Sequence, residues 1–165
     1  MENISAHITY DEATNSPTAK AKGISNEPTL QHLKAMVMVA NKCFEPVRKF
    51  ANVPLKINSF YRAPDLNKAI GGAVDKLGNP RSQHCKGEAI DFTGNGKIKN
   101  SALFQFIKTN LDFDQIICEH PINGEPTWVH VSYKEGANRM QLLTVDKESP
   151  HGRSYKKGDC NECNA

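Results

Sequence analysis

The sequence lacks the features of a membrane-spanning protein and of a secreted domain held together by disulfides. No apolar run approaches the roughly 20 residues that a membrane span requires. The first residues, Met1 to Ile4, contain neither a basic region nor a hydrophobic segment, so we expect synthesis in a cytoplasm without a signal peptide. The five cysteines are odd in number and irregularly spaced, which argues against a secreted disulfide framework.

A strong charge of one sign is also absent. The chain has 21 Lys and Arg against 18 Asp and Glu, which gives a net charge of +3 at pH 7. The basic residues are scattered rather than gathered on one helix, so the sequence gives little support to nucleic-acid binding.

The length of 165 residues suits one domain with a real hydrophobic core. We expect this domain to span residues 1–146, with residues 1–28 packed on it as an extended segment. Residues 147–165 are expected to form a polar, flexible tail, and the protein is expected to be a monomer.

Apolar periodicity predicts two amphipathic helices. The first spans residues 29–50, where Asn26 or Thr29 could cap the start and Pro46 should end or kink the helix. Its expected buried residues are Leu30, Leu33, Val37, Ala40, Phe44 and Val47. The second spans residues 100–111, and a shorter helix follows Pro64 and ends at a glycine pair.

Alternating or short apolar segments predict strands at several places along the chain. These segments are residues 4–10, 55–60, 88–93, 114–119, 127–133 and, as an edge strand, 140–145. The polar segments 11–29 and 73–81 read as surface loops. Helices that precede a mostly antiparallel set of strands indicate the α+β class.

Three residues could together bind one zinc ion: His84, Asp91 and His130. A catalytic zinc site takes three protein ligands and leaves a fourth position to water. Within the strand at 127–133, Val129 and Val131 face one way and His130 faces the other. Spacing alone leaves other roles open: a core histidine for His130, a loop residue for His84 and a turn cap for Asp91.

Several segments of the chain resemble one family of zinc peptidases. The pattern Ser82-x-His84-x-x-Gly87-x-Ala89-x-Asp91, followed by Trp128-Val129-His130-Val131-Ser132, is similar to the metal-binding pattern of the zinc D-alanyl-D-alanine carboxypeptidase family. That family includes phage endolysins and shares a core with the hedgehog signalling domain. The segments 23–26, 57–62 and 66–72 also resemble the branch named for the C-terminal domain of these carboxypeptidases.

The resemblance implies a hedgehog/DD-peptidase-like fold with one zinc ion bound by His84, Asp91 and His130. It also implies that Arg62 faces the substrate, where its guanidinium could hold an oxyanion or a substrate carboxylate. Ser82 and Gln83 would support the ligands or contact substrate, although a turn-capping serine and a plain loop glutamine are the alternatives.

The general base is where the chain departs from the best-known family pattern. Many members carry Glu or Asp three residues before the second histidine, and that position is Thr127 here. Two carboxylates are close in sequence, Glu119 at a strand end and Glu125 in the following loop. We favour Glu119, because a strand pair can aim it toward His130, and a solvated strand-end glutamate is the alternative.

Other reactive residues have weaker patterns. His120 could hydrogen-bond a transition state, but an exposed turn histidine is the preferred interpretation. Cys85 is interpreted as a partly buried free thiol rather than a ligand. Cys160 and Cys163 resemble half of a zinc knuckle or a redox pair without a second pair, and they stay unassigned.

The resemblance therefore predicts metal-assisted hydrolysis of peptide bonds in bacterial peptidoglycan. The bond could be D-Ala-D-Ala, a cross-link or L-Ala-D-Glu, and a phage lysin or virion component is the expected setting. The competing hypothesis is a non-catalytic zinc module that uses the same ligands for stability or partner binding.

Overall fold

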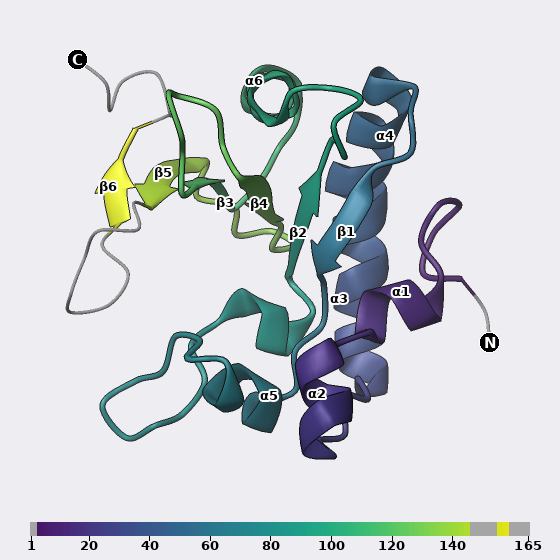
Figure 1. The fold of residues 1–165 in the computed structure, drawn as a ribbon, viewed down its shortest axis with the longest axis vertical. Helices are drawn as coiled ribbons and strands as arrows, with labels where there is room; N and C mark the ends of the chain where they lie inside the picture. Colours follow the sequence, from purple (N-terminus) through teal and green to yellow (C-terminus); the bar gives the residue numbers. More distant parts are fainter. Residues whose placement is uncertain (1–2, 146–154, 159–165) are drawn as a thin grey trace.

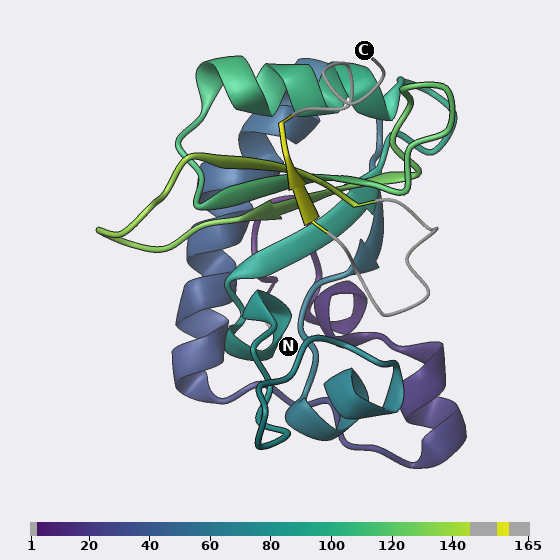
Figure 2. The same cartoon turned by 90° about the vertical axis from the view of Figure 1, so that its left-hand side faces the viewer.

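A six-stranded sheet organises the part of this computed structural model that can be described, residues 3–145 and 155–158 (Figures 1 and 2). The strand order is β1-β2-β4-β3-β5-β6, and every neighbouring pair is antiparallel except β3 with β5. The strands are β1 (Lys56–Ser59), β2 (Ala89–Thr93), β3 (Gln115–Glu119), β4 (Trp128–Ser132), β5 (Gln141–Val145) and β6 (Tyr155–Lys157). The α+β prediction is confirmed.

The two faces of the sheet carry different residues, because side chains alternate along each strand. Directly opposed residues share a face, so Asp91 opposite His130, and His130 opposite Ile117, all point to one side. The other side presents apolar residues, including Ile90, Phe92, Ile116, Val129 and Val131, all fully buried. The prediction that His130 faces the side of the sheet opposite to Val129 and Val131 is confirmed.

One long helical segment covers the apolar face of the sheet. It consists of α3 (Leu30–Val39), the π-helical turn η1 (Ala40–Phe44) and α4 (Glu45–Ala51). The wider turn comes just before Pro46, which has no N–H to donate and whose ring would clash with a preceding carbonyl. The helix therefore absorbs the proline and continues, and Thr29 rather than Asn26 caps its start.

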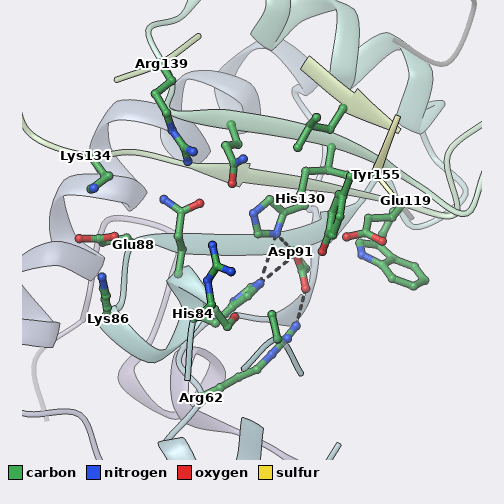
Figure 3. A pocket seen from close by; sticks show the side chains of 18 of the residues that line it. Arg62, His84, Lys86, Glu88, Asp91, Glu119, His130, Lys134, Arg139 and Tyr155 are labelled. Atoms are coloured by element: carbon green, nitrogen blue, oxygen red, sulfur yellow. Dashed lines mark hydrogen bonds and ion pairs between the residues drawn. The ribbon is translucent and has the colours of Figure 1, made fainter. Parts of the chain in front are cut away.

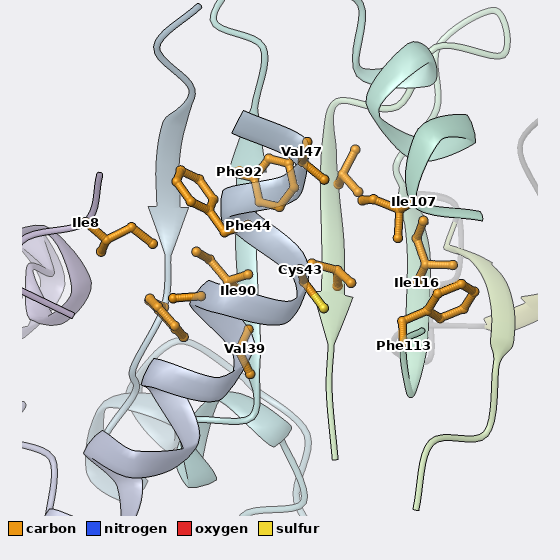
Figure 4. Packing of buried hydrophobic residues seen from close by; sticks show 14 of the residues in the cluster. Ile8, Val39, Cys43, Phe44, Val47, Ile90, Phe92, Ile107, Phe113 and Ile116 are labelled. Atoms are coloured by element: carbon orange, nitrogen blue, oxygen red, sulfur yellow. The ribbon is translucent and has the colours of Figure 1, made fainter. Parts of the chain in front are cut away.

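The buried side of this helix differs in part from the predicted one. Leu30 and Val37 are 70% and 38% exposed. Met36, Val39 and Cys43 are buried beside the predicted Ala40, Phe44 and Val47, and α6 (Asn100–Asn110) adds Leu103, Phe104 and Ile107 to the same core (Figure 4). The π turn shifts the helical register, so a strict 3.6-residue period assigns some positions to the wrong side.

The N-terminal region is helical where the sequence suggested a strand and a long surface segment. Short helices α1 (Tyr10–Thr14) and α2 (Pro17–Lys22) are started by capping side chains, Thr9 and Ser16. Between residues 4 and 10 only one isolated bridge, Ser5 with Ile8, has strand-like pairing. Each helix is too short to show apolar periodicity, so capping is the signal that distinguishes them.

The remaining elements lie close to their predicted positions. Helix α5 (Pro64–Ala69) begins at the proline, and the 3-10 turn η2 (Gln83–Lys86) precedes β2. Strand β5 is not an edge strand, because β6 pairs with it from within the segment predicted to be a flexible tail. Cys160 and Cys163 lie outside the described residues, and no described helix is long and apolar enough to cross a membrane.

Candidate metal centre and its pocket

A pocket of about 660 Å³ opens on the sheet face that points away from the core (Figure 3). The predicted site residues come together here from five elements or their flanks. They are Arg62, Ser82, Gln83, His84, Asp91, Glu119 and His130. Glu125 is the exception among the candidates.

Three ligand atoms converge on the floor of this pocket. Nε2 of His84 lies 3.3 Å from Nδ1 of His130, and Oδ1 of Asp91 lies 3.2 Å from the first and 2.8 Å from the second. All three side chains are buried. Two imidazole nitrogens and one carboxylate oxygen form the donor set that zinc favours at catalytic sites, so these residues fit one metal ion.

His84 is oriented by the segment that follows β1. Its Nδ1 lies 2.7 Å from the carbonyl oxygen of Phe60, while its own carbonyl accepts the backbone N–H of Arg62. A proton on Nδ1 for the first bond leaves the lone pair of Nε2 to face the other two ligands. The imidazole is thus fixed in the tautomer that can bind a metal.

Gly87 closes the η2 turn with φ of +72° and lies against α3. A Cβ atom at this position would lie 2.5 Å from the backbone oxygen of His32 and 2.8 Å from Cγ of Met36. The glycine of the metal-binding motif is therefore required by the close approach of η2 to α3.

Asp91 is held from its outer side by Arg62. One terminal nitrogen of Arg62 donates to Oδ2 of Asp91 at 2.7 Å, and its Nε donates to Oγ of Ser59 at 2.8 Å. The side-chain amide of Asn26 bonds the backbone of Tyr61 and Ala63 on either side of the arginine. Arg62 therefore orients a ligand, and its second terminal nitrogen takes part in neither bond.

Electrostatics favour the protonation states that metal binding needs. Burial lowers the pKa of His84, which favours the neutral ring. Burial by itself would raise the pKa of Asp91, but the neighbouring His84 and His130 hold it well below its ordinary value. These shifts favour a neutral imidazole at His84 and an ionised carboxylate at Asp91, the forms that bind a metal ion.

Glu119 lies on the same wall as the three ligands. It is directly opposite Trp128 in the β3–β4 pair, two residue pairs further along than Ile117 and His130 and on the same face of the sheet. The side chain is buried, and Oε2 lies 3.8 Å from Nε2 of His120. Glu119 is therefore aimed at the pocket that holds the metal ligands.

Glu125 is placed elsewhere by its own hydrogen bonds. Its carboxylate accepts the backbone N–H of Ser101 at 3.1 Å and the hydroxyl of the same residue at 2.6 Å, at the start of α6. It lines a separate pocket with Asn100 and Thr127. Of the two candidate bases, the geometry favours Glu119.

No role was predicted for Arg139, which lines the pocket, or for Asp114, which bonds both Arg139 and Gln83. Asp114 has no exposed side-chain surface, and it accepts bonds from Nε2 of Gln83 at 2.9 Å and from the guanidinium of Arg139. The position of Asp114 directly before the apolar strand β3 was the one feature of the sequence that could have predicted a buried carboxylate here. Arg139, in the loop after β4, carried no such signal.

Two aromatic residues border the Glu119 end of the pocket. Trp128 belongs to the recognised β4 segment, whereas Tyr155 comes from β6 and was not predicted. The ring of His120 packs edge-on against Trp128 at 5.1 Å, and its side chain is largely buried rather than exposed. Cys85 is a buried free thiol, as predicted, and is not among the converging ligand atoms.

Comparison with known families agrees with this geometry. The family model for peptidase M15 matches residues 6–132. The chain belongs to the peptidase M15 family. M15 proteins are metallopeptidases that act on D-Ala-containing peptides, and the matched range contains the buried His84, Asp91 and His130. No curated protein matches the sequence. Arg139 and Tyr155 lie beyond the M15 match.

Proposed function

We propose that this M15 chain is a zinc-dependent peptidase that cleaves bacterial peptidoglycan, either as a D-Ala-D-Ala-type carboxypeptidase or as a stem-peptide endopeptidase. The observation that carries the proposal is the convergence of three ligand atoms beside Glu119 in one pocket. The resemblance to phage endolysins supports a lysin or virion component that reaches the cell wall during infection.

The chemistry can be assigned to residues of this pocket. When bound by His84, Asp91 and His130, zinc supplies a Lewis acid that lowers the pKa of water and polarises a carbonyl. Glu119 accepts the proton of the attacking water and passes it to the leaving amine. Arg62 keeps the Asp91 carboxylate in place, and its second terminal nitrogen stabilises the oxyanion.

Digestion of purified peptidoglycan, followed by mass spectrometry of the fragments, tests the activity and names the bond. We expect defined peptide products that disappear when a chelator is present. Intact peptidoglycan after digestion with zinc-loaded protein would contradict the proposal.

Ser82 and Gln83 are proposed to assist substrate binding from the pocket wall.

The role of Glu119 can be separated from metal binding by one substitution. We expect Glu119→Gln to keep stoichiometric zinc and to lose about 10²–10⁴-fold in turnover, the usual contribution of a general base. Glu125→Gln is the matched control and should keep full activity, because Glu125 bonds Ser101. Full turnover in Glu119→Gln would reject this base.

Zinc content tests the ligand set independently of activity. Elemental analysis should find about one zinc per chain, and the variant His84→Ala with His130→Ala should bind none, because it keeps one ligand of three. If the wild type binds one zinc per chain but leaves peptidoglycan uncut, the non-catalytic zinc module becomes the better interpretation.

A further inference from the structure

The pocket has two chemically different ends on either side of the metal ligands. Along β4, Trp128, His130 and Ser132 face the pocket side in turn, and their β3 partners are Glu119, Ile117 and Gln115. Glu119 therefore marks one end. Asp114, which immediately precedes Gln115, marks the other, and Figure 3 shows Arg139 and Lys134 on the side of His130 opposite Glu119.

Arg139 is fixed in position at this second end. Its Nε donates to Oδ1 of Asp114 at 2.8 Å, and one terminal nitrogen donates to Oδ2 at 2.5 Å. The carboxylate is fully buried, while the arginine side chain is 54% exposed. A guanidinium has five N–H donors, so the second terminal nitrogen, which neither bond uses, can donate into the pocket.

Two other cations lie at the same end of the pocket as Arg139. Lys86 and Lys134 also line the pocket, and Glu88 lies on the same side. Figure 3 shows Lys86, Glu88 and Lys134 on the same side of His130 as Arg139. Asp114 offsets one positive charge and Glu88 another, so three cations against two carboxylates leave this end with a net positive charge. Such an end attracts an anion.

The position of Glu119 gives the direction of the substrate. Because Glu119 passes its proton to the leaving amine, the leaving group lies at the Glu119 end, and the acyl part of the substrate extends toward Arg139. Along β3, Ile117 lies opposite His130 and is three residues from Asp114, which bonds Arg139, and three residues of a strand span about 10 Å. A group near Arg139 is therefore about two or three extended residues from the bond that is cut.

We propose that Arg139 and Lys134 form a subsite for a substrate carboxylate on the acyl side of the scissile bond. This inference rests on the proposed function. In a peptidoglycan stem peptide, the free α-carboxylate of D-Glu stands two or three residues before the bonds made by the terminal D-Ala residues. The subsite therefore directs cleavage to these bonds and away from the L-Ala-D-Glu bond, whose acyl side carries no carboxylate.

Two synthetic pentapeptides test the subsite: L-Ala-γ-D-Glu-L-Lys-D-Ala-D-Ala and the same peptide with D-isoglutamine in place of D-Glu. For zinc-loaded wild type we expect kcat/KM to be about tenfold higher for the acid, as for one charge-assisted hydrogen bond. Lys134→Gln should reduce this ratio, and Arg139→Gln should bring it close to one. Lys97→Gln, which removes the same charge outside this pocket, should keep it.

Equal rates for the two peptides in wild type would overturn the subsite, as would an unchanged ratio in both variants or cleavage between L-Ala and D-Glu. Lys134→Gln keeps the test valid if Arg139→Gln does not fold, because no bond to Asp114 is lost. If neither peptide is cut, the affinities of the two labelled peptides for the protein are compared by fluorescence anisotropy. Tighter binding of the acid would support the subsite although the proposed function fails, and equal binding would reject both.

Discussion

At the residue scale, Gly87 shows why a motif position near a metal ligand is a glycine. Its positive φ and its approach to His32 both exclude a side chain. We expect Gly87→Ala to destabilise the fold by about 3 kcal/mol, combining left-handed strain with a steric clash. Zinc affinity should also fall, because η2 carries His84. Urea unfolding and zinc titration measure the two effects.

Gly96 provides the matched control for this substitution. Its φ is +73°, but a Cβ atom there would have nothing within 4 Å. Gly96→Ala should therefore cost only the conformational term, about 1 kcal/mol, and leave zinc affinity unchanged. Equal losses of unfolding free energy in Gly87→Ala and Gly96→Ala would show that the close approach of Gly87 to α3 adds nothing to the cost of the substitution.

The sequence was sufficient for residues whose role depends on residue type and spacing. His84, Asp91 and His130 were candidates because three zinc-type ligands flank short strands, and they converge. The sequence was not sufficient to predict the ion pair between Arg139 and Asp114, because this pair depends on how the loop after β4 folds back on β3. The choice of Glu119 over Glu125 likewise depended on strand register, which brings one glutamate to the pocket wall.

At the element scale, Asp114 connects three parts of the chain: β3, η2 through Gln83, and the loop that carries Arg139. Burial alone would raise its pKa, but the bonds from Arg139 and Gln83 hold the pKa below its ordinary value of 3.8. The folded state thus binds this proton less tightly than the unfolded state does. The stabilisation is complete above the unfolded pKa and is lost as pH falls through the folded one.

Asp114→Asn tests this link between elements. We expect the variant to lose about 2 kcal/mol of stability at pH 7, a moderate value because Arg139 is half exposed. The difference from wild type should stay constant down to about pH 4.5 and shrink in more acidic solution. Denaturant unfolding at several pH values measures it, and a difference that persists unchanged at pH 2 would contradict the charge-based explanation.

Helices and strands were predictable where their apolar pattern was long enough. The helix at 100–110 and the strands on both sides of it lie within one or two residues of expectation. The π turn before Pro46 was not predictable from periodicity, because the proline makes the helix change its own period. Strand β6 was missed because its three residues are polar and exposed and depend on β5 for pairing.

At the scale of the whole molecule, a bound metal would join η2 to two sheet strands on the face opposite the main core. Metal removal should therefore weaken the fold without abolishing it. With free zinc at about 100 times Kd, the linkage contributes about 2.7 kcal/mol, so we expect a chelator to lower Tm by about 5–10 °C. Calorimetry measures this shift.

The double variant His84→Ala with His130→Ala is the control for chelation. Its Tm should not respond to a chelator, because the ligands are absent. An equal response in this variant would place the stabilising metal elsewhere. Unfolding of the wild type by the chelator at room temperature would show that the core on the helical face is insufficient by itself.

The alternation along β4 also limits how this chain can change in length. Val129 and Val131 are fixed in the core while His130 is fixed at the metal centre. A one-residue insertion or deletion inside β4 would exchange the two sides of the strand. It would place the imidazole among buried phenylalanines and the valines in the pocket. Related chains can therefore lengthen the loops on either side of β4, but not the strand itself.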